Sequence, residues 1–320
     1  MNTTLHNMRW LMKREYIEHR KLIYAGPWLG VALLVLNLVF TVIVFFHSED
    51  GIRFSNDSNH GSTLAFHLGS DTHLGVGLGH LSADNISELS HAIFVAVNGA
   101  LGLFVLALGA SVLSFGLSCL FDERRDRSVL FWKSMPTTDT QTVAAKFIFG
   151  LLVLPLVWVA VALVTSGLLV ATYALAISWA GGDLGLVFAH SQLLTLAGLV
   201  MASVPVYLLT LVPALAWVML CSATARRHPA VIALIVPALF ALLGAMGWHN
   251  PVWNLLIGRL FPTGFVSGLR ADAVSGASWT HVVAPVLSPL ADPQLWLGIV
   301  FGAACLAAVI WYRRRYTVLV

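Results

Sequence analysis

Long apolar stretches, separated by shorter polar segments, dominate the chain. A helix needs about 20 residues to cross the roughly 30 Å hydrocarbon core of a bilayer. Six stretches meet that length, and none contains Asp, Glu, Lys, Arg or His. One such residue costs about 2.5 to 3.5 kcal/mol at the membrane centre, so their absence indicates true spans. The pattern predicts transmembrane helices at 26–46, 92–121, 147–179, 193–221, 230–248 and 295–312.

The composition agrees with this pattern. Hydrophobic residues make up 58% of the 320 residues and charged residues only 10%, which excludes an ordinary soluble fold. The net charge of +3 indicates neither a nucleic-acid-binding protein nor an acidic disordered chain. Cys119, Cys221 and Cys305 lie in or at the ends of spans. They are interpreted as small apolar packing residues, because they form no disulfide framework.

Lys and Arg residues gather on one side of the predicted membrane. Five precede the first span, five lie between the second and third, two between the fourth and fifth, and three follow the last, which leaves three on the other side. Acidic residues divide six to nine in the opposite sense. Because cytoplasmic segments carry the excess of Lys and Arg, both termini are predicted to be cytoplasmic. The first span lacks a small-residue cleavage pattern and is interpreted as a retained anchor.

The N-terminal segment 1–25 is predicted to be a cytoplasmic amphipathic helix at the membrane interface, because apolar residues recur at helical spacing while charges occupy other faces. The recurring residues are Leu5, Met8, Met12 and Tyr16. Trp10 and Tyr16 are expected at the level of the lipid headgroups. A passive membrane anchor is the alternative to a functional role for this helix.

The polar segment 122–146 separates the second and third spans. Charge crowds its first residues, apolar Val129 to Trp132 follow, and Pro136 stops the helix before Thr138 or Asp139 caps the next one. This order predicts a short cytoplasmic helix whose apolar half lies against the membrane. Its charged end either meets a partner or is a solvated face, and the residues alone leave both open.

The first outer loop, 47–91, is rich in histidine. It holds six of the twelve histidines, which are His47, His60, His67, His73, His80 and His91. The spacings of seven, six and seven between His60 and His80 match neither a helical pair nor a compact metal-ligand signature. We therefore expect a polar, partly structured loop and assign no metal site.

The second long outer region, 249–294, contains an apolar run at 253–269 that Arg259, Pro262 and Gly264 interrupt. The run is too broken to span a membrane and too apolar for a free loop. A re-entrant helical pair covered by protein would satisfy its backbone, and so would an interfacial helix lying flat. Both interpretations stay open at this point.

Several chemistries are excluded because their motifs are absent. No Gly-Lys pair occurs, so the phosphate-binding loop of Walker-type ATPases cannot form, and there is no HExxH or GxSxG motif. Ion-coupled carriers usually keep an ionisable residue inside a span, and these spans have none. A neutral pathway suits an amphipathic or hydrophobic cargo better than a proton or metal ion. The polar residues left inside the spans are Asn37, Thr41, Asn98, Ser111, Ser114, Ser166, Ser203, Tyr207 and Thr210.

Two glycine pairs inside the spans, Gly26 with Gly30 and Gly298 with Gly302, have the G-x-x-x-G spacing. Such pairs let two helices approach closely. The spacing is common, so it identifies no particular helix partner.

One arrangement of residues resembles a known family. Glu-Arg at 123–124, an apolar stretch, Met-Pro at 135–136, a polar turn and Ala-Ala-Lys at 144–146 entering the third span resemble the type-two family of ABC-transporter permeases. The charged segment 13–20 before the first span is similar to the N-terminus of the same family. The likeness in span number covers the whole chain, and the motifs cover about forty residues of it.

The resemblance implies the transmembrane subunit of a bacterial ABC exporter in the plasma (inner) membrane. Such a subunit holds no cofactor, and two copies of a separate ABC ATPase bind ATP and Mg²⁺. Six spans are half of a transporter in this family, so a second permease chain is expected, identical in the simplest closure. Glu123, Arg124, Arg125 and Asp126 would open the coupling helix that docks in a groove of the ATPase.

The expected fold is therefore an all-α polytopic membrane protein with six transmembrane helices. The interfacial helix 1–25 precedes the transmembrane domain 26–312, which includes the outer loop 47–91, the coupling loop 122–146 and the re-entrant region 249–294 and is followed by the basic tail 313–320. The expected function is a permease, not an enzyme, that exports a lipid, peptide or antibiotic. The alternative is a membrane-embedded sensor or assembly factor whose His-rich loop responds to metal or pH.

Overall fold

The computed structural model describes residues 2–47, 52–53, 67–68, 83–126, 137–179, 193–245 and 286–316. Within these residues the protein is helical except for one antiparallel pairing of β1 (Ile52–Arg53) with β2 (His67–Leu68). The α-helices are α1 (Asn2–Glu18), α2 (Arg20–His47), α4 (Ala83–Ser118), α5 (Phe121–Arg125), α7 (Asp139–Ile148), α8 (Leu154–Trp179), α10 (Leu193–Thr224), α11 (Pro229–Ala245) and α15 (Pro293–Tyr316).

Five of the described helical segments are long and apolar enough to cross a membrane, as in an α-helical polytopic membrane protein. They are Arg20–Val42, Ala96–Arg125, Asp139–Ala176, Ala197–Thr224 and Pro293–Arg315. They coincide with five of the six predicted spans. The remaining predicted span, 230–248, overlaps α11, which has 17 residues up to Ala245, where this described range ends. A sixth crossing therefore stays a prediction.

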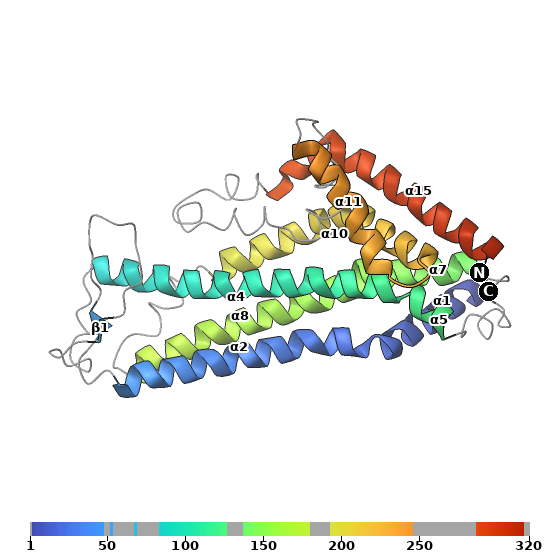
Figure 1. Cartoon of the computed structure of the whole chain (residues 1–320). Helices are drawn as coiled ribbons and strands as arrows, with labels where there is room; N and C mark the ends of the chain where they lie inside the picture. The colour runs from blue at the N-terminus through green and yellow to red at the C-terminus, as the bar shows by residue number, and fades with distance from the viewer. Residues whose placement is uncertain are drawn as a thin grey trace.

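The long helices pack side by side around one apolar core. Figure 1 shows α2, α4 and α8 running alongside one another, with α10 and α15 crossing at one side. Both termini lie at one end of the molecule together with α1, α5 and α7, while β1 lies at the opposite end (Figure 1). The core includes the fully buried side chains of Val112, Phe115, Leu154, Leu211 and Val309. Large apolar side chains also cover the outer faces of α2, α11 and α15, as lipid contact requires.

The glycines at G-x-x-x-G spacing bring helices of this one chain together. A Cβ added to Gly30 of α2 would lie 2.6 Å from Thr165 Oγ1 of α8. A Cβ added to Gly302 of α15 would lie 2.9 Å from Val212 Cγ1 and 3.3 Å from the Pro213 backbone in α10. These approaches are closer than a side chain allows, so the two glycines serve packing within the chain.

A π-helical turn, η2 (Phe149–Val153), connects α7 to α8 inside the span predicted at 147–179. The N–H of Leu154 donates to the carbonyl of Phe149, five residues back. Pro155 follows directly, and a proline removes one backbone donor and crowds the preceding turn. A widened turn accommodates both effects, and such single turns are frequent at functional sites.

The ends of the chain differ from the predicted segment boundaries. The predicted N-terminal helix 1–25 is divided at His19, because α1 ends at Glu18 and α2 begins at Arg20. The predicted tail begins inside α15, whose last turn carries Arg313, Arg314 and Arg315, where cations interact favourably with the helix dipole. Most of the His-rich loop, residues 127–136 and the apolar run at 253–269 lie outside the described residues.

The packing of α15 on α10 predicts that Gly302→Ala lowers stability by about 1 to 3 kcal/mol, because its added methyl group meets backbone atoms of Pro213. Gly102→Ala in α4 is the matched control, since nothing lies within 4 Å of a Cβ there and alanine favours a helix. Thermal unfolding in detergent, followed by tryptophan fluorescence, measures both. Equal unfolding temperatures for the two variants would contradict the packing.

Candidate functional site

Charged side chains from four helices converge in the interior at the end of the molecule that holds both termini. We call this group the charge cluster, and its members are Arg14 and Glu15 of α1, Glu123 of α5, Lys146 of α7 and Arg313 of α15. All five are buried, and the Lys146 side chain has no solvent exposure. Removing so many charges from water costs several kcal/mol per ion unless each is paired. Their pairing therefore decides whether this end can fold.

Glu123 is the centre of the cluster. Its carboxylate accepts hydrogen bonds from Arg14 and from Arg313 Nη1, the latter at 3.0 Å. The Lys146 ammonium lies 3.2 Å from Glu123 Oε1. One carboxylate thus binds three cations, each from a different helix, and connects α5 to α1, α7 and α15.

Glu15 forms the second strong pair. Lys146 Nζ donates to both of its carboxylate oxygens, at 2.8 Å and 3.0 Å. Burial raises the pKa of Glu15 above its usual range, and Lys146 opposes that rise. For Arg14, burial opposes ionisation, but the nearby carboxylates of Glu123 and Glu18 raise its pKa above the ordinary value. The guanidinium of Arg14 therefore stays charged in the interior.

Two further carboxylates close the cluster at its edge. Arg313 Nε donates to Asp139 Oδ1 at 3.0 Å, and Arg14 Nε donates to Glu18 Oε1 at 3.0 Å. With these, four carboxylates face the three cations Arg14, Lys146 and Arg313. Each buried cation thus has at least two acidic partners, which is the condition under which buried charges are tolerated.

The local sequence explains why α7 presents Lys146 at this depth. Thr138 is the N-cap of α7, its hydroxyl accepts the N–H of Gln141, and the Gln141 side chain accepts the N–H of Thr138. This reciprocal capping box fixes the first turn of the helix. Lys146 lies two turns further along, on the face that also buries Thr142 and Val143. The cap therefore determines where the buried ammonium enters the core.

Arg124 fastens α5 to another helix. Its Nη2 donates to the carbonyl oxygens of Ser222, at 2.6 Å, and Ala225, at 2.8 Å. These carbonyls lie at the C-terminal end of α10, where helices leave acceptors without partners. The Ser222 hydroxyl also accepts the N–H groups of Leu120 and Phe121. The start of α5 is thus held at the end of α10.

The four residues predicted to dock with an ATPase are divided by the structure. Glu123 is 6% exposed and binds inside the cluster, and Arg124 is half-buried against α10. Arg125 and Asp126 lie at the surface, each with 63% of its side chain exposed, and pair with each other at 3.3 Å. A docking role for these residues stays a prediction, and the geometry leaves surface contact to the last two.

His19 lies in the turn between α1 and α2, beside the cluster. Its ring packs edge-on against Phe115, with ring centroids 4.8 Å apart, and its Nε2 is 3.7 Å from Glu15 Oε2. Burial, assisted by the charge of Lys146, lowers the pKa of His19 to about 4. The imidazole is therefore neutral at neutral pH and belongs to the aromatic packing there.

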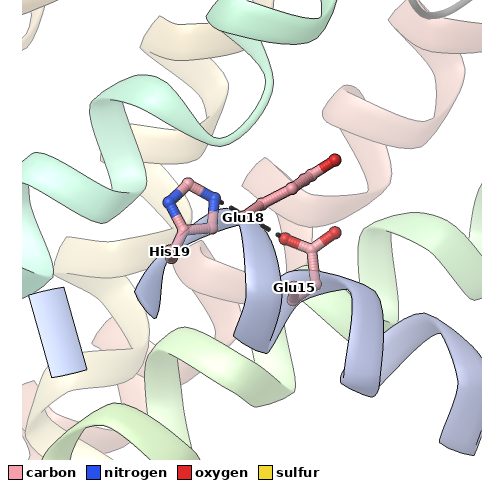
Figure 2. A group of neighbouring side chains, drawn as sticks. All are labelled: Glu15, Glu18 and His19. Carbon is pink, nitrogen blue, oxygen red and sulfur yellow. Dashed lines mark ion pairs between the residues drawn. The ribbon is translucent and has the colours of Figure 1, made fainter. Parts of the chain in front are cut away.

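Glu15, Glu18 and His19 lie close enough together on one turn of helix to suggest a metal site (Figure 2). Their donor atoms all lie within 4.8 Å of one another. The carboxylates already bind cations of the chain, however, since Glu15 accepts Lys146 and Glu18 accepts Arg14. A metal ion would have to displace those cations, so we assign the group to the charge cluster.

Polar residues within the spanning helices bind to neighbouring protein groups. Asn37 of α2 donates to the Tyr173 hydroxyl at 2.5 Å and accepts from Thr172 of α8 at 2.9 Å. The hydroxyls of Ser166 and Ser203 donate to carbonyls of their own helices. Asn37 therefore joins α2 to α8, whereas Ser166 and Ser203 bond within their own helices. A pathway for an amphipathic or hydrophobic cargo stays a prediction.

Sequence reasoning missed the cluster as a unit. The sequence pattern places Glu123 in a docking helix, Arg313 in a tail and Lys146 in a motif at the start of the third span. One feature of the sequence does indicate the cluster: residues of both charge signs lie within one or two helical turns of the ends of the predicted spans, on one side of the membrane. Because ions close to the bilayer need partners, such residues are candidates for pairing with one another.

No protein-family model, curated protein or solved structure matches this chain. The site's possible role therefore follows from its geometry. Ion pairs of Glu123 join α5 to α1, α7 and α15, and hydrogen bonds of Arg124 join it to α10. Arg125 and Asp126 on the far side of α5 are exposed.

Removing the central carboxylate tests the cluster. Glu123→Gln is expected to destabilise the protein by about 3 to 5 kcal/mol, because it leaves Arg14, Lys146 and Arg313 facing a neutral group. Asp126→Asn, on the exposed face of the same segment, is the control and is expected to change stability by less than about 0.5 kcal/mol. Unfolding in detergent with added SDS measures both. Similar losses in the two variants would contradict a central role for Glu123.

The position of His19 predicts a dependence of stability on pH. Because its folded pKa of about 4 lies below the ordinary value of 6.5, the unfolded chain binds the proton first as the pH falls. The stabilising contribution is complete above about pH 6.5 and is lost toward pH 4, by up to about 3 kcal/mol. The His19→Gln variant is expected to lose less stability than the natural chain between pH 6.5 and pH 4, as measured by their unfolding temperatures across that range. Parallel pH profiles for the variant and the natural chain would rule it out.

Proposed function

We propose that this chain is the transmembrane permease subunit of an ATP-driven ABC transporter. It exports an amphipathic or hydrophobic cargo, such as a lipid, peptide or antibiotic, while a separate subunit hydrolyses ATP. The family resemblance of the 122–146 segment supports the proposal, together with five helices of spanning length. The observation that carries it is the attachment of the short surface helix α5 by ion pairs to α1, α7 and α15 and by hydrogen bonds to α10.

A helix of five residues has little stability of its own. The position of α5 is therefore set by its contacts, through Glu123 to three helices and through Arg124 to the end of α10. Removing one partner of a buried ion pair costs about 3 to 5 kcal/mol. A force applied to α5 consequently moves the attached helix ends together before it separates the ion pairs.

The surface that receives this force is the outer side of α5. Arg125 and Asp126 are exposed, and Asp122 is partly exposed and lies 3.5 Å from Arg125. We assign ATPase contact to these side chains and assign Glu123 and Arg124 to internal attachment. In this proposal the docking helix predicted from the sequence has an outer side that contacts the ATPase and an inner side that attaches to the other helices.

The assembly follows from the same proposal. The end with the charge cluster also carries both termini (Figure 1) and most of the Lys and Arg residues. We therefore place this end on the cytoplasmic side of a bacterial inner membrane. Two such chains, identical in the simplest case, form one transporter with two ATPases. ATP and Mg²⁺ bind to the ATPase.

Charge reversal on the outer side of α5 tests the docking assignment. Arg125→Glu combined with Asp126→Lys is expected to reduce cargo-stimulated ATP hydrolysis by about tenfold or more, because complementary charges would become repulsive. The assay uses the full chain, purified with the ATPase that accompanies it and reconstituted in vesicles. Both positions are exposed, so the unfolding temperature is expected to stay unchanged.

Arg226→Glu is the matched control, since Arg226 is an exposed cation in the turn after α10. It is expected to leave hydrolysis near the natural rate. Two results would overturn the proposal: full hydrolysis in the α5 double variant, or failure of any Walker-type ATPase to co-purify with the natural chain.

A further inference from the structure

The side of α1 that faces away from the bundle combines cations with apolar side chains. Leu11, Arg14 and Glu15 are buried on the inner side. On the outer side Arg9 and Lys13 are exposed. The neighbouring Trp10, Tyr16 and Ile17 are also exposed, by 43%, 43% and 57%. We call the exposed residues Arg9, Trp10, Lys13, Tyr16, Ile17 and, at the start of α2, Arg20 the outer α1 face.

The charge cluster makes this face positive. The two carboxylates of α1, Glu15 and Glu18, pair with Lys146 and Arg14 on the inner side. Internal pairing thus uses the acidic groups that would otherwise neutralise the surface cations of the helix. Arg9, Lys13 and Arg20 are left to set the charge of the outer α1 face.

The face is continuous with the surface of a spanning helix. The Tyr16 side chain lies close enough to Tyr24 of α2 for the two phenols to interact, and both rings are exposed. Tyr24 is 50% exposed and Trp28, one turn further on, is 73% exposed. Amphipathic aromatic rings gather at the headgroup level of membranes. The outer α1 face therefore begins where the lipid-facing side of α2 ends.

We propose that the outer α1 face binds the surface of a bilayer that contains anionic phospholipids. The cations recognise headgroup phosphates and the excess negative charge of the leaflet, while Trp10, Tyr16 and Ile17 enter the boundary between headgroups and acyl chains. Exposing these three large apolar side chains to water alone would be unfavourable. Each Lys or Arg near an anionic surface strengthens binding about fivefold. Anionic lipid thereby presses α1, and with it Arg14 and Glu15, against the bundle.

Trp10 provides a local readout. The full chain is reconstituted in phosphatidylcholine vesicles that contain either brominated phosphatidylglycerol or the same fraction of brominated phosphatidylcholine. Bromine quenches nearby tryptophan, and the Trp10→Phe variant, measured in parallel, isolates the contribution of Trp10 from those of the other tryptophans. We expect Trp10 to be quenched more strongly by the brominated anionic lipid. High salt is expected to reduce the excess, because the screening length falls from about 8 Å to about 3 Å.

Arg9→Gln combined with Lys13→Gln is expected to reduce the excess quenching of Trp10 by the brominated anionic lipid by more than tenfold, because each of the two lost cations contributes about fivefold. Arg226→Gln with Arg227→Gln removes two exposed cations at another site and is expected to leave the excess unchanged. Size-exclusion profiles of the variants check folding.

Equal quenching of Trp10 by both brominated lipids would overturn the proposal, because the helix would then enter the interface without recognising charge. Absence of quenching by either lipid would also overturn it and would leave the outer α1 face to water or a protein partner. Neither result depends on an ATPase, so the outcome is separate from that of the proposed function.

Discussion

The contact of Glu123 with Arg14, Lys146 and Arg313 holds together the end of the molecule on which the other features depend. A single carboxylate in a water-poor environment interacts strongly with cations that would exchange freely at an exposed surface. The three cations come from helices far apart in the sequence, so their common partner aligns the ends of α1, α7 and α15. The aromatic packing of His19 and Phe115 lies beside the same cluster.

This alignment connects local sequence to mechanism. The capping box at Thr138 sets the depth of Lys146, and the serine and arginine contacts at the end of α10 set the position of α5. The π-helical turn η2 follows Lys146 within the next turn and allows α8 to continue past Pro155. The regular spans are therefore joined to the surface segment through irregular structure that ion pairs and hydrogen bonds hold in place. Movement between helix ends would be transmitted there in the proposed transporter.

The same ion pairs give α1 a side with paired charges and a side with unneutralised cations. Glu15 is buried, Glu18 pairs with Arg14 at the edge of the cluster, and Arg9 and Lys13 are exposed. One helix thus contributes both to a balanced interior and to a positive surface. The apolar residues predicted as a single stripe divide accordingly. Met8 and Met12 are half-buried and Tyr16 is exposed, while the buried face centres on Leu11, Arg14 and Glu15. Hydrophobic periodicity alone assumes that charges seek water, and here protein cations replace water as their partners.

The sequence by itself determined the helical membrane class, five of the six spans it predicts, and a helix cap at Thr138 or Asp139, because long uncharged stretches and capping residues act locally. It also identified the segment that contains α5. Only the tertiary structure decided that Glu123 and Arg124 face inward, that α1 breaks at His19, and that Gly30 and Gly302 pack within the chain. Glu15 and Lys146 are separated by 131 residues. No local pattern records such a pairing, because it exists only once the helices that carry the two residues have packed.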